Sequence, residues 1–155
     1  MRTVCKRHFI FSLVIVSVSI LQYACSGTRN AMPSKIGLLP LEAYDYTGSN
    51  PEADTVFRVI QNEIMFDASF RATSASARQP AFQGQTVVAI VMRAAPPTPL
   101  HFSRAEVSGT AINVYAETCT GCDRTRAVVA TIPNVGNVRL VRFFIGGESK
   151  ASINL

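Results

Sequence analysis

The sequence predicts a mainly β domain of the α+β class, built as an antiparallel meandering sheet or a small sandwich, with one short helix near residues 63–72. Three observations predict this class. Segment 86–92 is a near-continuous apolar run of strand length, typical of a central strand that is covered on both faces. Other strand-like segments are separated by turn residues, and a single segment carries apolar residues at helical spacing.

The first 25 residues have the pattern of a secretory signal peptide. Arg2, Lys6 and Arg7 form a basic start, and an unbroken apolar run of 13 residues extends from Phe9 to Leu21. As a helix, such a run spans roughly 20 Å, which is short of the ~30 Å hydrocarbon core of a bilayer. We therefore expect an exported protein, located in the cell envelope or secreted, rather than one with a permanent membrane span.

The sequence leaves two routes open for processing of the signal peptide. The stretch Leu-Gln-Tyr-Ala-Cys that ends at Cys25 resembles a bacterial lipoprotein signal, in which the cysteine is lipidated. Gln22 and Tyr23 depart from that pattern, because it has an aliphatic and a small residue in their places. Lipidation of Cys25 would anchor the protein to a membrane, since each buried methylene contributes ~0.8 kcal/mol. Cleavage after Ser26 would instead give a periplasmic or secreted protein.

The rest of the chain predicts a tether at 26–53 and one β-rich domain at 54–155. Residues 26–35 are polar and lack periodicity, as a tether does. The short apolar stretch 36–46, broken by Pro40, predicts an added edge strand. About 130 residues remain without the signal, which is enough for one domain with a buried core.

The domain is expected to begin with a strand and a helix. Residues 55–60 are β-branched and apolar and predict a strand. Asn62 is suited to cap a helix, Glu63 is favourable in its first turn, and apolar residues recur at helical spacing as far as Phe70. The spacing predicts a helix over 63–72.

Short apolar or alternating segments follow and predict about five strands, at 86–92, 100–107, 111–116, 126–132 and 138–145. Gly109, the Thr120-Gly121 pair and the stretch 134–137 separate them as turns. Because short turns of this kind join neighbouring strands, we expect successive strands to pair antiparallel in a meander.

Cys119 and Cys122 form a Cys-x-x-Cys motif, the one motif with evident chemical potential. In a thioredoxin-like enzyme such a pair lies at a helix start, where the helix dipole lowers the pKa of the first thiol. Here it lies between two predicted strands, so we predict a disulfide at the tip of a hairpin, with Gly121 at positive φ. A redox-active pair and half of a metal site stay open, although zinc needs four ligands and the mature chain offers one histidine, His101.

Three prolines make the segment from Ala94 to Pro99 stiff and extended. Stiffness suits a binding loop, and the predicted binding residues are Pro96, Pro97, Thr98, Pro99 and His101. The alternative is a rigid crossover between two sheets or a guard against edge aggregation. His101 has apolar neighbours and is expected to be a strand residue facing solvent or satisfied in the core, rather than a general base.

Composition and motifs exclude several function classes. The formal charge of +5 falls to about +2 without the signal, and the arginines are scattered, which is typical of a solvated surface rather than of a nucleic-acid interface. The sequence has no Gly-x-Ser-x-Gly elbow and no Gly-rich phosphate loop. We therefore expect no catalytic residue, no cofactor and no metal, and a protein that acts by binding.

The order of several segments also resembles that of a known family. A Val-Ile-Gln-Asn stretch at 59–62 leads into a short helix, Pro80-Ala81-Phe82 precedes the apolar strand, and Val-Val-Ala-Thr-Ile-Pro follows at 128–133. From about Thr55 to Gly147 the chain resembles the C-terminal domain family of the protease-complex subunit PrcB and related small exported bacterial proteins. That family often has a Thr-Gly-Gly-Tyr-like turn after the central strand, where this chain has Pro-Thr-Pro-Leu.

The resemblance implies a compact, β-rich, exported module that associates with or stabilises a partner protein without catalysis of its own. We therefore expect a protein partner in the envelope and, if Cys25 is lipidated, an attachment to the membrane. The alternative function is that of an envelope thiol-disulfide protein that uses Cys119 and Cys122.

Overall fold

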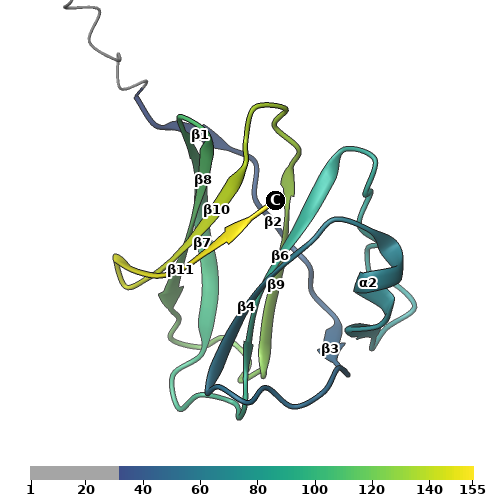
Figure 1. Ribbon diagram of the computed structural model, residues 1–155. Helices are drawn as coiled ribbons and strands as arrows, with labels where there is room; N and C mark the ends of the chain where they lie inside the picture. Colours follow the sequence, from purple (N-terminus) through teal and green to yellow (C-terminus); the bar gives the residue numbers. More distant parts are fainter. Residues whose placement is uncertain (1–31) are drawn as a thin grey trace, which may run out of the picture. The chain divides into compact units, whose positions relative to one another are not determined.

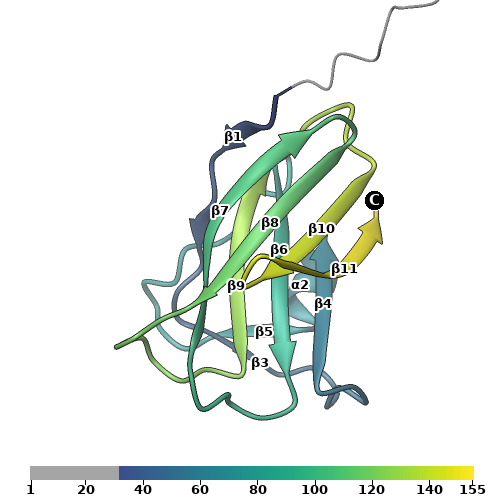
Figure 2. The same cartoon turned by 90° about the vertical axis from the view of Figure 1, so that its left-hand side faces the viewer.

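The computed structural model describes residues 32–155, in which two β-sheets pack face to face as a sandwich (Figures 1 and 2). The five-stranded sheet has the order β1 (Ser34–Ile36), β7 (Leu100–Ser108), β8 (Ala111–Thr118), β10 (Leu140–Ile145) and β11 (Glu148–Asn154). The four-stranded sheet has the order β2 (Leu39–Pro40), β9 (Ala127–Pro133), β6 (Gln85–Met92) and β4 (Thr55–Ile60). The predicted mainly β, α+β class is confirmed, in its sandwich form.

A third, smaller layer lies on the outer side of the four-stranded sheet. It consists of the helix α2 (Glu63–Asp67) and of a two-stranded sheet formed by β3 (Tyr44–Tyr46) and β5 (Phe70–Ala72). Figure 1 shows α2 and β3 beside β4, β6 and β9, on the side away from the five-stranded sheet. Within residues 32–155, no helix has the length and apolar character that crossing a membrane requires.

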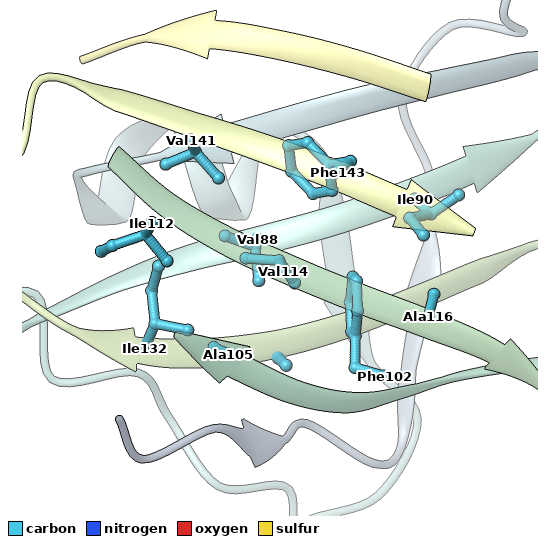
Figure 3. Close-up of a cluster of buried hydrophobic side chains, with 11 residues drawn as sticks. Val88, Ile90, Phe102, Ala105, Ile112, Val114, Ala116, Ile132, Val141 and Phe143 are labelled. Carbon is cyan, nitrogen blue, oxygen red and sulfur yellow. The ribbon is translucent and has the colours of Figure 1, made fainter. Parts of the chain in front are cut away.

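The main core lies between the two large sheets. Side chains from both sheets form one buried cluster, drawn in Figure 3, in which Val88 from β6 and Val114 from β8 lie close together. Phe143 from β10 is fully buried in the same cluster, and its ring centroid lies 5.2 Å from that of Phe57. Alternation along each strand brings these residues to the inner face.

The opposite face of β6 is buried as well. Val87, Ala89 and Val91 pack in a second cluster with Phe66 of α2 and Phe70 of β5, and all three are fully buried. The rings of Phe66 and Phe70 are stacked, with their centroids 5.3 Å apart. The prediction of a central strand covered on both faces is confirmed, which explains why its sequence is apolar throughout rather than alternating.

The helix is shorter than predicted. Its beginning is confirmed, because the side chain of Asn62 accepts a hydrogen bond from the backbone N–H of Met65 at 2.9 Å. Its predicted end at residue 72 is wrong, because α2 stops at Asp67 and Phe70 starts strand β5, which pairs antiparallel with β3. Phe70 reaches the apolar cluster from a strand, so its spacing from Phe66 did not require a longer helix.

The expected antiparallel meander is confirmed for the hairpin of β7 and β8 and is wrong for the strands before and after it, which change sheets. β9 lies in the four-stranded sheet, and β8 pairs in parallel with β10, with Val114 opposite Phe143. A parallel pair requires a crossover connection, and here the chain makes it through β9 in the other sheet. The polar strand β11 lacks the β-branched pattern that predicts strands and was not expected from the sequence.

Part of the predicted tether forms strands. β1 pairs with β7, β2 with β9 and β3 with β5, so the described end of segment 26–53 belongs to the folded unit. The predicted signal peptide at 1–25 and the predicted lipidation site Cys25 lie outside the described residues.

Candidate functional site

Two crossover connections meet near one end of the sandwich. Residues 93–99 lead from β6 to β7, and residues 119–126 lead back from β8 to β9, so each passes from one sheet to the other. Both lie in the lower half of Figure 2. The backbone N–H of Cys119 donates to the carbonyl oxygen of Pro99 at 2.9 Å, which joins the two connections directly. The proline segment forms the predicted crossover between sheets.

Cys119 and Cys122 form a disulfide, as predicted, with their Cα atoms 5.7 Å apart. Gly121 between them has φ of 93°, which agrees with the predicted positive φ. The predicted hairpin tip is wrong, because β8 and β9 do not pair with each other but lie in different sheets. Cys122 is exposed and Cys119 is half-buried, so the disulfide lies at the surface.

Two adjoining hollows flank the disulfide and share Gly121 and Cys122 in their walls. The smaller has a volume of about 340 Å³ and includes Pro97, Thr98 and Pro99, three of the predicted binding residues. The larger, of about 480 Å³, is lined by residues of four segments: Pro40, Leu41, Glu42, Ala43, Tyr44, Leu100, His101, Phe102, Gly121, Cys122, Asp123, Thr125, Ala127, Val128 and Val129. Pro96, also predicted, lines neither hollow.

The larger hollow continues a seam between β7 and β9. At the other end of this seam, β1 covers β7 and β2 covers β9. The chain follows β9 as far as Leu41, whose N–H donates to the carbonyl of Val129 at 2.9 Å. It then turns away at Ala43, which has φ of 63° and is the one non-glycine residue with positive φ in the described part of the chain. Such a conformation costs about 1–2 kcal/mol for a residue with a Cβ.

The charged groups of the larger hollow are acidic. Glu42 and Asp123 line it, both are exposed, and no lysine or arginine of residues 32–155 lines it. Tyr44 forms part of its wall and donates a hydrogen bond from its hydroxyl to the carbonyl of Arg78 at 3.3 Å. Burial raises the pKa of Tyr44 above its ordinary value, and the nearby carboxylate of Asp67 adds to the rise.

His101 lines the larger hollow and is half-buried. It lies opposite Glu117 in the β7–β8 ladder, so its side chain is on the same face as Glu117 and on the other face from Phe102. The Nδ1 atom is buried and has no hydrogen-bond partner within the described residues. The sequence predicted that His101 faces solvent or is satisfied in the core. The half-buried imidazole, with a buried Nδ1 that has no partner within residues 32–155, fits neither description.

Comparisons with family models, curated proteins and solved structures found no match to this chain. In the part of the chain that the structure describes, no three His, Cys, Asp or Glu side chains gather as a metal site would need.

The sequence identified candidate site residues in the two crossover connections, but it did not identify those at 41–43 and 127–129. Leu41, Ala43 and the first residues of β9, 127–129, carry no local signal of a site, because they are ordinary apolar residues. Glu42 and Asp123 are acidic residues in irregular connecting segments, of a kind common on any surface. Only their position around one hollow singles them out.

Removal of the disulfide is expected to cost little stability. The bond joins cysteines only three positions apart, so on the chain-entropy model the double change Cys119→Ser, Cys122→Ser lowers the free energy of unfolding by about 2 kcal/mol. Urea unfolding of the oxidised protein and of the variant measures the difference, with Thr120→Ser as the control that keeps the bond. A loss well above 4 kcal/mol would mean that the disulfide supports more of the fold than this loop.

Proposed function

We propose that the mature chain is an exported, non-catalytic binding module of the bacterial cell envelope, which holds a protein partner at the crossover end. The crossover end comprises residues 96–99 and 119–124. The observation that carries the proposal is the meeting of two stiff connections, distant in sequence, around two adjoining hollows. The composition of residues 1–25 and the resemblance to an exported, partner-binding family support the location and the class of function.

The stiffness of this surface favours recognition. Pro97 and Pro99 fix their φ angles near −65°, and the disulfide of Cys119 and Cys122 restrains the facing connection. A surface that is already in its bound conformation loses less conformational entropy on binding than a mobile loop does. The proposed binding surface therefore consists of residues whose backbone conformation is already restrained in the free protein.

Capture of envelope proteins on the immobilised mature chain tests the proposal. We expect a partner that binds the intact protein and is captured at least about tenfold less by the double variant Pro97→Ala, Pro99→Ala, because the free connection then has more conformations to lose. Asn137→Ala is the matched control, since it changes an exposed residue in the connection between β9 and β10 at the opposite end of β9. Equal capture by both variants, or no partner at all, would refute the proposal.

Mass spectrometry of the mature N-terminus tests export. An acylated Cys25 would establish a lipid anchor, and a start at Gly27 would establish cleavage after Ser26. A mature protein that keeps its initiator Met1 would contradict export altogether.

The second candidate is an envelope thiol-disulfide protein, favoured by the exposure of Cys122 in a surface disulfide with Arg124 nearby in the smaller hollow. A cation near a thiol lowers its pKa and promotes exchange. Titration of the reduced protein with a thiol reagent, followed against pH, separates the candidates. The binding module is expected to show an ordinary thiol pKa and slow exchange with glutathione, whereas a redox protein would show a depressed pKa and rapid exchange.

A further inference from the structure

The larger hollow lies where the edges of β7 and β9 have no paired strand within residues 32–155. β1 pairs with β7 only at residues 105–107, and β2 pairs with β9 only at residues 130–131, with one further bond to Val129. Beyond these points no strand of residues 32–155 pairs with the facing edges of β7 and β9 as far as the disulfide, and the hollow of about 480 Å³ occupies this stretch. Its volume is in the range of sites that hold small ligands or short peptide segments.

The register of β7 shows which backbone groups face the seam. Pro99 accepts a hydrogen bond from Cys119 of the neighbouring chain segment, and Leu100 and Phe102 lie opposite Thr118 and Ala116. In an antiparallel ladder hydrogen-bonded and non-hydrogen-bonded pairs alternate. The N–H and C=O groups of Leu100 and Phe102 are therefore directed away from β8 and toward the seam.

The register of β9 leads to the same conclusion on the other side. The carbonyl of Val129 accepts from Leu41, so residues two apart from Val129 also direct their backbone groups to this edge. Ala127 is the next such residue, and its carbonyl accepts from the Thr125 hydroxyl at 2.8 Å. The N–H of Ala127 would meet the chain at Ala43, but the chain turns away there.

The side chains around the seam define what could lie in it. Leu100, Phe102 and Val128 supply an apolar lining, and Glu42 and Asp123 are acidic groups at an exposed position. An extended segment directs alternate side chains to opposite faces, so it can place an apolar residue inward and a basic residue against the carboxylates.

We propose that the seam binds an extended peptide segment of the partner, which carries a basic side chain and pairs as an added strand with Leu100, Phe102 and Ala127. The segment continues the line of β2 along β9, and its lysine or arginine lies against Glu42 and Asp123. This inference rests on the proposed function and names the chemistry of the partner. Main-chain hydrogen bonds supply the affinity, and the acidic pair supplies the preference.

Amide hydrogen exchange on the mature protein tests the inference, with the capped peptide Ac-Val-Lys-Val-Lys-Val-NH2 as the probe. We expect millimolar probe to slow exchange at Leu100, Phe102 and Ala127 at least about tenfold, because these N–H groups become hydrogen-bonded. The acidic control peptide Ac-Val-Glu-Val-Glu-Val-NH2 is expected to protect these three N–H groups much less. A probe with N-methylated backbone amides should not protect them, because it cannot pair as a strand.

A charge variant checks the acidic pair. The double change Glu42→Gln, Asp123→Asn is expected to weaken binding of the basic probe about threefold to tenfold, as the loss of exposed ion pairs does. Glu148→Gln is the matched control, because Glu148 accepts from Lys150 on β11, at the far edge of the five-stranded sheet.

Three results would overturn the inference. The first is that no probe slows exchange of these amides, and the second is that the N-methylated probe binds equally well. The third is protection of the same amides by self-association without a probe, which would identify a second copy of the chain as the occupant. If a partner is still captured through Pro97 and Pro99 while the probes fail, the proposed function stands and only the peptide seam is refuted.

Discussion

An aspartate at Val87 or at Val88 is expected to prevent the domain from folding. The two neighbours are fully buried on opposite faces of β6, Val88 between the large sheets and Val87 in the cluster of the third layer. Neither position lies opposite a cationic residue in the ladders with β4 and β9, and an unpaired buried charge costs several kcal/mol. That cost is a large part of the whole stability of a domain, which is about 5–15 kcal/mol.

Circular dichroism and thermal unfolding of the two variants measure the effect. Ser152→Asp is the control, since Ser152 is exposed on β11 opposite Arg142 and should tolerate the charge. In a sandwich of only two layers, one face of β6 would be open to water and one of the two changes would be harmless. A folded Val87→Asp variant would therefore contradict the presence of the third layer.

Replacement of Phe143 by alanine is expected to lower the free energy of unfolding by about 3–5 kcal/mol. Phe143 is fully buried between the sheets beside Phe57, and its loss leaves a cavity in the main core. Phe144→Ala is the matched control, because Phe144 is the next residue on the other face and is half-buried against Tyr115, with ring centroids 4.9 Å apart.

The control should lose only about 1–2 kcal/mol, from one aromatic contact and partial burial. Urea unfolding of both variants gives the comparison. Equal losses in the free energy of unfolding at the two positions would mean that Phe143 does not lie on the core-facing side of β10.

The local elements of the fold were largely predictable because each has a local cause. Strand β4 has the predicted bounds, 55–60, and Asn62 caps the helix as its side-chain oxygen suggests. The end of α2 was not predictable, because Phe70 satisfies helical spacing and strand pairing equally well until β3 is placed beside it. β11 was missed because only Ala151 and Ile153, which pack against the main core, are apolar in it, and its other residues are polar as in many edge strands.

Topology and site were predictable only in part. Thr120-Gly121 has the composition of a hairpin turn, and nothing local distinguishes a hairpin from a crossing to the other sheet, which depends on where β9 finds its partners. The proline segment and the cysteine motif were each identified as candidates. Their meeting through Cys119 and Pro99 extends the β7–β8 ladder by one pair, so it depends on how those two strands pair and not on either segment alone.

The parallel pairing of β8 with β10 has a consequence for synthesis of the chain. Val141 and Phe143 enter the interior from β10, so the space between the sheets stays unfilled until β10 has emerged from the ribosome. Contacts that join distant parts of a chain form slowly. Late closure is expected to delay folding of the nascent polypeptide, which suits the export that we propose for this protein.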